Sequence, residues 1–382
     1  MEKERVYIFD TTLRDGEQCR GAAMTVPQKL EMADMLEHIG VDIIEAGFPG
    51  ASLGDLKAVS EIAKRVRSTV VCALARALPA DIGRAGAALK SAVRPRIHTF
   101  IGTSPRHMKK LGMTPERVHE LVIESVSLSR NLAPDVEWSC EDGTRSDPEF
   151  LCRLIEVAIN AGATTINIPD TVGITDPDEY FALIRNLRER VPNSDKAVFS
   201  VHCHNDLGMA VANTLAGVKA GARQVECTVM GLGERAGNAA LEEVVMAMKV
   251  RGMPFETRAD TTQFGPAVKL LSEITGFPIA YNKAIVGRNA FAHGSGIHQS
   301  GVLKDSGSYE IMVPAAVGWD EIAISLSKHS GRAALAFRLE LLGHRFSGNR
   351  LDSLFVRFKA LADHVKEVTD DDLQSLVLAE SA

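Results

Sequence analysis

The chain has 382 residues, of which 45% are hydrophobic and 24% charged, with a formal net charge of -6 and a pI near 6.0. This composition is that of an ordinary globular protein, and the length favours one large domain with a smaller one attached. The acidic balance, without any cluster of Lys and Arg, argues against a nucleic-acid partner.

The N-terminus and the cysteines indicate where the protein works. The first residues run directly into a strand-like segment without the apolar core of a signal peptide, and no uncharged stretch approaches the length of a membrane span. The six cysteines include no Cys-x-x-Cys pair, so we expect free thiols and not disulfides or a thiolate metal site. We therefore expect a cytoplasmic protein with no membrane contact.

Short β-branched runs alternate with helical patterns up to about residue 250, which is typical of βα units around a parallel sheet. The expected strands are 5–10, 41–47, 69–75, 96–101, 135–140, 164–168, 198–203 and 223–229. Helices are expected near 27–39, 52–66, 80–92, 115–130, 147–161, 177–190, 207–220 and 239–250. Several of them have start signals in which a polar cap precedes a proline, such as Thr114-Pro115 and Asp147-Pro148. Eight units of this length favour a (β/α)₈ TIM barrel over an open sheet.

After residue 250 the alternation stops. Residues 278–308 are rich in Gly, Asn and Ser, and amphipathic helix patterns follow near 330–343 and 350–366. We expect a catalytic barrel over residues 1–275, followed by a linker and a small, mainly helical subdomain over 276–382.

Polar and ionisable residues collect where the expected strands end. Active sites of (β/α)₈ barrels lie at this face, whereas a purely structural barrel would not require such a concentration. The strand ends carry, in chain order, Arg14 and Asp15, Glu45, Arg76, Glu141, Asp170 and Thr171, His202 and His204, and the loop 231–238.

His202 and His204 stand two residues apart at the end of the seventh expected strand, so both imidazoles share one face. Asp15 after the first strand and the amide oxygen of Asn238 after the eighth come from neighbouring strands once the barrel closes. Together they form a set of two nitrogen and two oxygen ligands without thiolate, which suits Mg²⁺, Mn²⁺ or Zn²⁺. We therefore predict a divalent metal site at this edge of the barrel.

The segment Gly231–Ala236 also fits the dinucleotide-binding pattern Gly-x-Gly-x-x-Gly/Ala. That pattern belongs to the first unit of an open sheet, whereas this segment follows the last βα strand. We therefore expect it to shape the metal site and a ligand path.

Three stretches carry a family resemblance: FDTTLRDGEQ at 9–18, HCHNDLG at 202–208 and GLGERAGN at 231–238. Together they resemble the acyl-CoA condensing branch of the metal-dependent TIM-barrel family that contains 2-isopropylmalate synthases and homocitrate synthases. The similarity runs from about residue 4 to about residue 375, and the three stretches in this order are very specific.

The resemblance implies a reaction and roles for its residues. Asp15, His202 and His204, with Asn238 nearby or coordinating, would hold the metal, and a 2-oxo acid would chelate it. Arg14 would help polarise the ketone and Thr171 would contact the carboxylate. A carbanion from acetyl-CoA, the co-substrate, would add to that ketone, and hydrolysis of the thioester would follow. The base implied for the carbanion is His298, supported by Glu141 and Tyr309.

Which 2-oxo acid is preferred depends on the walls of the pocket that receives its side chain. The candidates for these walls are Leu74, His98, Ser139 and Asn167. Homocitrate synthases need a cation for a second carboxylate, yet the fifth expected strand carries Glu137 in that region, where an unpaired anion would cost affinity. An apolar acid such as 3-methyl-2-oxobutanoate therefore fits better, and 2-oxoglutarate is the alternative.

The resemblance also implies a homodimer in which the C-terminal subdomain serves the partner's barrel. Relatives that act in leucine synthesis usually continue into a leucine-binding regulatory domain, so a chain ending at residue 382 is expected to be either naturally short or truncated. Two other interpretations are a metal-dependent lyase or aldolase, against which His298 and Tyr309 argue, and a barrel without catalysis, which would lack a ligand or a base.

Overall fold

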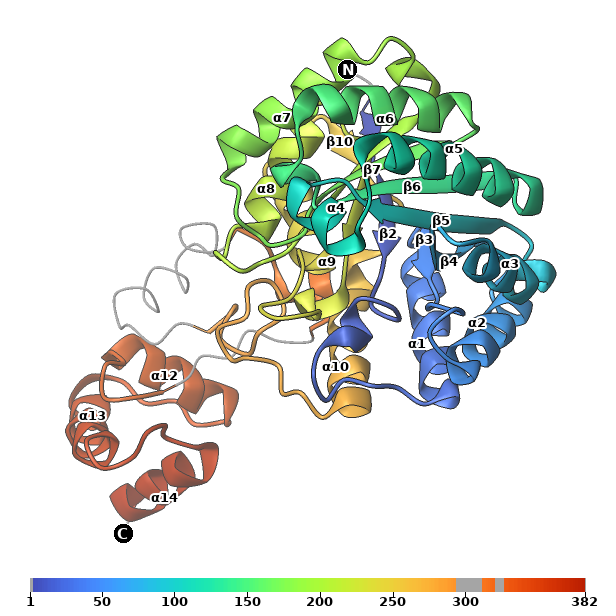
Figure 1. The fold of residues 1–382 in the computed structure, drawn as a ribbon. Coiled ribbons are helices and arrows are strands. Elements are labelled where there is room, and N and C mark those ends of the chain that lie inside the picture. Colours follow the sequence, from blue (N-terminus) through green and yellow to red (C-terminus); the bar gives the residue numbers. More distant parts are fainter. Residues whose placement is uncertain (1–2, 293–310, 320–325, 382) are drawn as a thin grey trace. The chain divides into compact units, whose positions relative to one another are not determined.

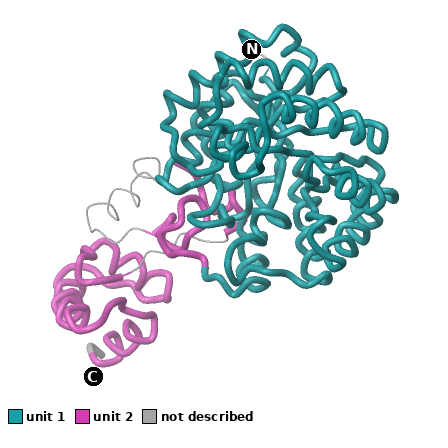
Figure 2. Tube along the Cα trace, viewed as in Figure 1, with its two compact units in different colours: residues 1–278 teal, residues 279–382 magenta. Residues whose placement is uncertain are grey.

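The computed structural model describes residues 3–292, 311–319 and 326–381. The chain divides into two compact units, Met1–Pro278 and Ile279–Ala382 (Figure 2).

Unit 1 is built around a closed barrel of eight parallel strands in the order β2-β3-β4-β5-β6-β7-β8-β9 (Figure 1). The predicted (β/α)₈ barrel is thus confirmed. The barrel closes where β2 pairs with β9, with Tyr7 opposite Gln224 and Asp10 opposite Cys227. The strands are β2 (Tyr7–Asp10), β3 (Ile43–Glu45), β4 (Val70–Arg76), β5 (Pro95–Gly102), β6 (Asp135–Glu141), β7 (Thr165–Asp170), β8 (Val198–Cys203) and β9 (Gln224–Cys227).

Helices surround the barrel, and all of them except the short helix over 105–111 bury apolar residues. They are α1 (Val26–Ile39), α2 (Leu53–Arg65), α3 (Pro79–Ala88), α4 (Pro105–Leu111), α5 (Pro115–Leu132), α6 (Pro148–Asn160), α7 (Pro177–Arg190), α8 (Ala210–Lys219), α9 (Leu241–Val250) and α10 (Phe264–Thr275). The predicted helix starts are confirmed, because Thr114 accepts a hydrogen bond from the N–H of Arg117 and Asp147 from that of Phe150. Short 3₁₀ turns are η1 (Gly16–Gln18), η2 (Leu89–Ser91), η3 (Gly143–Arg145), η4 (Ser194–Lys196), η5 (Val229–Gly231) and η6 (Thr261–Gln263).

Four elements of unit 1 have no counterpart among the expected ones. The two-residue strands β1 (Glu4–Arg5) and β10 (Phe255–Glu256) pair in parallel as a separate small sheet. Helices α4 and α10 are the other two. None of these four elements contributes a strand to the barrel.

Unit 2 contains η8 (Pro314–Val317), α12 (Arg332–Leu341), α13 (Gly348–Ala362) and α14 (Asp370–Ser381). Its helices share a core that includes Leu335, Leu354, Phe358 and Leu373. The third helix, α14, was not expected from the sequence, whereas the other two were. Unit 2 thus has a hydrophobic core of its own.

All six cysteines are free thiols, as predicted. Among the described residues, no helix combines the length and the apolar composition that a membrane crossing requires.

Candidate metal-centred active site

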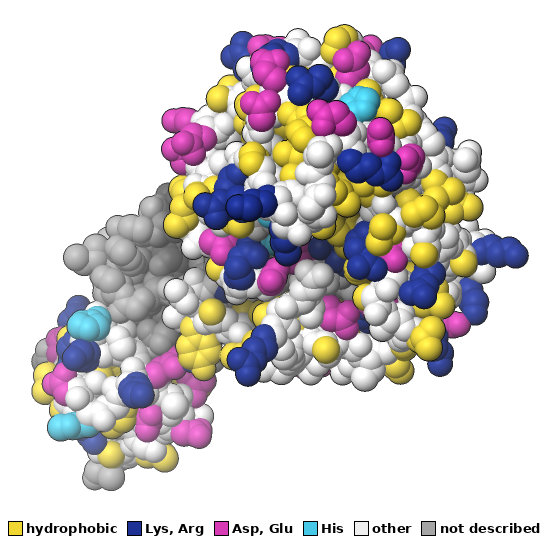
Figure 3. All heavy atoms as spheres, viewed as in Figure 1, with side chains coloured by type: hydrophobic (Ala, Val, Ile, Leu, Met, Phe, Trp, Pro, Cys, Tyr) yellow, Lys and Arg dark blue, Asp and Glu magenta, His cyan; other side chains and the backbone are white. Residues whose placement is uncertain are grey.

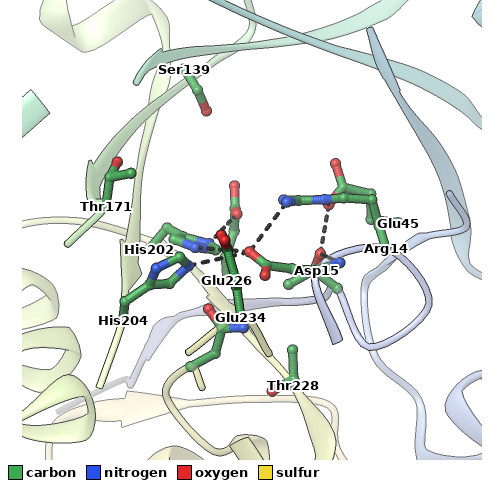
Figure 4. Close-up of polar contacts among 12 residues, drawn as sticks. Arg14, Asp15, Glu45, Ser139, Thr171, His202, His204, Glu226, Thr228 and Glu234 are labelled. Carbon is green, nitrogen blue, oxygen red and sulfur yellow. Dashed lines mark hydrogen bonds and ion pairs between the residues drawn. The ribbon is translucent and has the colours of Figure 1, made fainter. Parts of the chain in front are cut away.

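Asp15 and the two histidines of the predicted metal set meet at the carboxyl ends of β2 and β8. The Nε2 atoms of His202 and His204 lie 3.4 and 3.3 Å from the Oδ2 atom of Asp15. All three residues are buried, and their ligand atoms lie within 4.8 Å of one another. In Figure 4 the Asp15 carboxylate points between the two rings, with Arg14 on its other side.

His202 is oriented by a carboxylate on the neighbouring strand. Its Nδ1 lies 2.6 Å from Oε2 of Glu226, which stands directly opposite it on β9. Burial alone would lower the pKa of His202, but Glu226 and Asp15 outweigh burial and raise it to about 10. When Nδ1–H donates to Glu226, the Nε2 atom faces Asp15. A histidine that binds a metal through one ring nitrogen usually donates the N–H of the other to a carboxylate in this way.

Asp15 remains ionised in this setting. Burial would raise the pKa of its carboxyl, but the guanidinium of Arg14 and hydrogen bonds from both histidines hold it well below the usual range. A buried carboxylate that stays charged can serve as a metal ligand at neutral pH.

Arg235 approaches the other histidine from the loop after β9. Its Nη2 lies 2.5 Å from Nδ1 of His204, and the same guanidinium binds Asp206 and the backbone oxygen of Thr171. Since arginine can only donate, Nδ1 of His204 accepts and the ring proton lies on Nε2. A metal bound at Nε2 would therefore require this proton to leave Nε2, and a neutral ring with its proton on Nδ1 could no longer accept from Arg235, which would keep its bonds to Asp206.

Two oxygen atoms beside the histidines support a metal site. Oδ1 of Asp15 and Oδ1 of Asn238 are buried, and neither finds a hydrogen-bond partner among the described residues. Asn238 is bridged to His204 through its backbone, and its Nδ2 donates to the backbone oxygen of Leu232 at 3.1 Å. Buried oxygens without partners are costly unless a cation takes them, so this set of imidazoles and oxygens fits a divalent ion.

A cavity of about 210 Å³ opens beside this set. Its lining contains the predicted residues Arg14, Asp15, Leu74, His98, Ser139, Glu141, Asn167, Thr171, His202 and His204. Phe48, Phe100 and Pro169 add apolar surface to it. In the space-filling view, acidic and basic side chains gather side by side on the visible face of the barrel (Figure 3).

Glu141 and Thr171 have distinct surroundings within the cavity. Burial raises the pKa of the Glu141 carboxyl, and the nearby His107 and Lys110 only partly oppose this. The hydroxyl of Thr171 accepts a hydrogen bond from the N–H of Asp142 at 3.0 Å, so its own proton is available to donate into the cavity.

Glu137 does not face the cavity as an unpaired anion, and that expectation was wrong. Its carboxylate is fully buried and accepts hydrogen bonds from Arg96 at 2.8 Å and from Gln224 at 2.9 and 3.0 Å. The reason is the two-residue period of β6: Ser139 and Glu141 line the cavity, and Glu137 lies on the same face one layer deeper in the barrel.

Several residues of the site were missed from the sequence. Glu226, Phe48, Phe100 and Arg235 were not among the candidates. The alternation of β9 could have revealed Glu226, because it shares a face with Gln224 and stands opposite His202. The predicted bases His298 and Tyr309 lie outside the described residues.

Family models match both parts of the chain. The HMGL-like model matches residues 5–270, and the model described as the homocitrate synthase post-HMGL domain-like region matches residues 285–366.

Curated relatives match nearly the whole chain. It is 61% identical over 379 residues to a 2-isopropylmalate synthase of Bradyrhizobium sp. (strain BTAi1 / ATCC BAA-1182), which covers 98% of this chain and 72% of the relative. It is 59% identical over 384 residues to a 2-isopropylmalate synthase of Rhodopseudomonas palustris (strain BisB18), covering 100% of this chain and 74% of the relative.

Solved structures share the barrel. Hydroxymethylglutaryl-CoA lyase of Pseudomonas aeruginosa gives a TM-score of 0.62 at 22% identity, covering 75% of this chain and 97% of the lyase. The carboxyl transferase domain of Rhizobium etli pyruvate carboxylase gives a TM-score of 0.55 at 19% identity, covering 71% of this chain and 48% of the other. At such identities these matches speak for the fold alone.

Proposed function

We propose roles for the residues of this site on the premise that the chain belongs to the 2-isopropylmalate synthase family, within the HMGL-like proteins. The chain is an acyltransferase that condenses acetyl-CoA with 3-methyl-2-oxobutanoate and releases 2-isopropylmalate and CoA. This is the first committed step of leucine biosynthesis. The observation that carries the assignment is the identity of about 60% over nearly the full chain.

Asp15, His202 and His204 hold the divalent metal of this reaction, with Asn238 as the further oxygen donor. The unpartnered Oδ1 atoms of Asp15 and Asn238 support this set. When bound, the ion would supply Lewis acidity to the oxygens of the 2-oxo acid. The donor set suits Mn²⁺, Mg²⁺ or Zn²⁺.

Arg14 and Thr171 bind and orient the 2-oxo acid. Arg14 lines the cavity next to Asp15 and places positive charge where the ketone oxygen becomes an alkoxide during addition. Thr171 donates its hydroxyl proton to the carboxylate of the acid. This role is supported by the bond from Asp142, which occupies an acceptor position of the hydroxyl and leaves its proton available.

His298 removes a proton from the methyl group of acetyl-CoA, with Tyr309 and Glu141 in support. The raised pKa of Glu141 favours a role in handling that proton. The resulting carbanion adds to the ketone carbon, and water then cleaves the thioester so that CoA leaves.

The walls of the cavity favour an apolar side chain on the 2-oxo acid. Phe48, Leu74, Phe100 and Pro169 contribute apolar surface, and Arg14 is the one residue with a permanent positive charge among the described residues of the lining. A second carboxylate, as in 2-oxoglutarate, would find no free cation there, because the His98 ring is already paired with the Glu45 carboxylate at 2.8 Å and Arg14 with Asp15 and Glu45. An unpaired buried charge is strongly disfavoured. Homocitrate synthesis is therefore the less favoured alternative.

Residues 276–382 form a subdomain that completes the active site of the partner in a homodimer. The match of residues 285–366 to a separate family model supports a distinct module at this end of the chain.

The assignment of the substrate is tested by a panel of 2-oxo acids. The purified protein is supplied with Mn²⁺ and acetyl-CoA, and the release of free thiol is followed with 3-methyl-2-oxobutanoate, 2-oxoglutarate or pyruvate. We expect kcat/KM for 3-methyl-2-oxobutanoate to exceed that for 2-oxoglutarate by about 100-fold or more, because the second carboxylate stays unpaired. A higher kcat/KM with 2-oxoglutarate would overturn the assignment.

A further inference from the structure

Glu45 is a buried carboxylate at the end of β3, and it stands between two groups that line the cavity. Its side chain is fully buried, and it is absent from the lining of the cavity. Oε2 accepts hydrogen bonds from Nε of Arg14 and from the hydroxyl of Thr11, both at 2.6 Å. Oε1 lies 2.8 Å from Nδ1 of His98. One carboxylate therefore fixes Arg14 on one side and His98 on the other (Figure 4 shows Glu45 beside Arg14).

The contacts continue beyond His98 along the barrel wall. Nε2 of His98 lies 2.6 Å from Oγ of Ser139, and the same Oγ accepts a hydrogen bond from Nδ2 of Asn167 at 2.9 Å. His98, Ser139 and Asn167 all line the cavity. These contacts run from Arg14 through Glu45 to His98 on β5. From His98 they continue to Ser139 on β6 and Asn167 on β7.

The charge of Glu45 decides which way the Ser139 hydroxyl points. If both ring nitrogens of His98 carry protons, Nε2–H donates to Ser139, and the Ser139 proton is free to donate into the cavity. If His98 is neutral and keeps its proton on Nδ1, Ser139 must donate to Nε2 instead and offers the cavity no donor. Burial by itself lowers the pKa of His98, but Glu45 above all, together with Glu137 and Glu226, outweighs burial and raises it, which favours the first arrangement.

We propose that Glu45 is a positioning residue for the 2-oxo acid, holding Arg14 toward the ketone end and, through His98, turning the Ser139 hydroxyl toward the bound acid. The inference rests on the proposed function, because it assigns the ligand of this cavity to a 2-oxo acid. Glu45 itself does not touch the substrate.

The test is Glu45→Gln, which keeps the shape of the side chain and removes its charge. The amide keeps one acceptor oxygen and carries no charge, so it can no longer accept hydrogen bonds from both Arg14 and a doubly protonated His98. We expect KM for 3-methyl-2-oxobutanoate to rise roughly 10- to 100-fold, as is typical for loss of a hydrogen bond to a charged group. KM for acetyl-CoA should stay within about twofold. The Kd of 3-methyl-2-oxobutanoate alone, measured by calorimetry on the Mn²⁺-loaded protein, should rise in parallel with its KM.

Asp42→Asn is the matched control. Asp42 is also a buried carboxylate that binds an arginine, Arg5, but it directly precedes β3, at the end of the barrel opposite the cavity. If Glu45 positions the substrate, Asp42→Asn leaves KM for the 2-oxo acid unchanged. Equal increases in both variants would show a general effect of losing a buried charge and would overturn the inference.

The His98→Gln variant separates the direct effect of Glu45 on Arg14 from its effect on Ser139 through His98. If Glu45 acts partly through His98, the increases in KM caused by Glu45→Gln and His98→Gln are less than multiplicative in the double variant. Fully multiplicative effects, or a KM within twofold of wild type in Glu45→Gln, would refute the proposal. If Glu45→Gln does not fold, Glu45→Asp keeps the charge at shorter reach and should show an intermediate KM, and an unchanged KM there also refutes it.

These measurements are distinguishable from a failure of the proposed function. Wild-type protein that releases no thiol with 3-methyl-2-oxobutanoate contradicts the function, whatever the variants do. Wild-type turnover together with an unaffected Glu45→Gln variant contradicts the positioning role alone. Metal content is measured in parallel, and Glu45→Gln should retain wild-type Mn²⁺ because Glu45 is not in the proposed ligand set.

Discussion

The orientation of the His202 ring is fixed by the two carboxylates that it contacts. Glu226 takes the Nδ1 side of the ring at 2.6 Å, and Asp15 lies 3.4 Å from Nε2. The ring therefore cannot turn without losing a buried charged hydrogen bond, and its Nε2 atom stays aimed at the carboxylate. This fixed aim is what a metal ligand needs.

We expect His202→Ala to lose its metal. Loss of an outer-shell partner of a ligand typically weakens metal affinity by about 10- to 100-fold, so Glu226→Gln should fall in that range and His202→Ala beyond it. Mn²⁺ content after dialysis and calorimetric titration of the metal-free protein would measure both. His119→Ala, on the outer helix α5, serves as the control. Wild-type Mn²⁺ retention by His202→Ala would remove this residue from the ligand set.

Asp10, at the end of β2, is another buried carboxyl, and its ionisation predicts a dependence of stability on pH. Burial raises the pKa of Asp10 to about 7, although the N–H and the hydroxyl of Thr12 both donate to it. The unfolded chain releases this proton near pH ~4. Between these values the folded state binds more protons than the unfolded state, so stability falls as pH rises from about 4 to about 7 and then levels off.

Asp10→Asn should escape this loss because an amide does not ionise. The free energy of unfolding of the variant, relative to wild type, is expected to increase by up to about 3 kcal/mol between about pH 5 and about pH 8. Urea unfolding at several pH values measures it. A difference between variant and wild type that stays flat over this pH range would contradict the raised pKa of Asp10.

At the scale of elements, the strand β8, which carries His202 and is followed directly by His204, is in close contact with the helix that follows it, α8. A Cβ atom on Gly217 of α8 would lie 2.7 Å from Cγ1 of Val201 and 3.2 Å from Cε1 of Tyr180. Val201 precedes His202 on β8, and the hydroxyl of Tyr180 donates to the backbone oxygen of Ile168 on β7. The absence of a side chain at Gly217 therefore allows α8 to pack closely against β8.

Gly217→Ala should consequently disturb both stability and the metal site. Overpacking of this kind costs about 1–3 kcal/mol, which exceeds the gain of about 1 kcal/mol from replacing glycine in a helix. We expect a lower urea midpoint and weaker Mn²⁺ binding. Gly83→Ala in α3, where nothing lies within 4 Å of the added carbon, should be neutral or stabilising. If the two substitutions behave alike, the packing of α8 does not position β8.

The elements that the sequence predicted are those with a strong local pattern. Segments such as Val198–Cys203 are apolar and β-branched, which predicts a strand. In a closed (β/α)₈ barrel the carboxyl ends of all strands lie at one face, so the residues that follow the strands are expected to come together there. Strands β1 and β10 were missed because each has two residues and its partner lies about 250 positions away, so no local period marks them. The pairing of Glu137 with Arg96 was missed for a related reason: it depends on the register between β5 and β6, which sequence patterns do not specify.

The whole chain combines two units, each with its own core, and the proposed chemistry needs residues from both. Asp15, His202 and His204 belong to unit 1, whereas the proposed base His298 belongs to the stretch assigned to unit 2. Leu335, Leu354 and Phe358 give unit 2 a core that does not depend on residues of the metal set. A substitution in one unit can therefore remove its contribution to catalysis and leave the other unit folded.

Mixing two inactive variants tests whether the second unit serves the partner's barrel. His202→Ala removes a proposed metal ligand and His298→Ala removes the proposed base, so each variant alone should be inactive. In a mixed dimer with exchanged subdomains, the barrel of the His298→Ala chain receives an intact His298 from its partner. Random association makes about half of the dimers mixed, each with one working site of two, so about a quarter of wild-type thiol release should return.

The control for this experiment is the order of mixing. In one sample the two chains are denatured and refolded together, and in the other they are refolded separately and assayed immediately after mixing. Thiol release is expected to recover earlier in the first sample, because in the second the subunits must first exchange. If each subdomain serves its own barrel, every site in the mixture carries one defect and thiol release stays at the level of the separate variants. That result would rule out the exchanged dimer and leave the condensation itself untouched, because wild-type turnover is measured beside it.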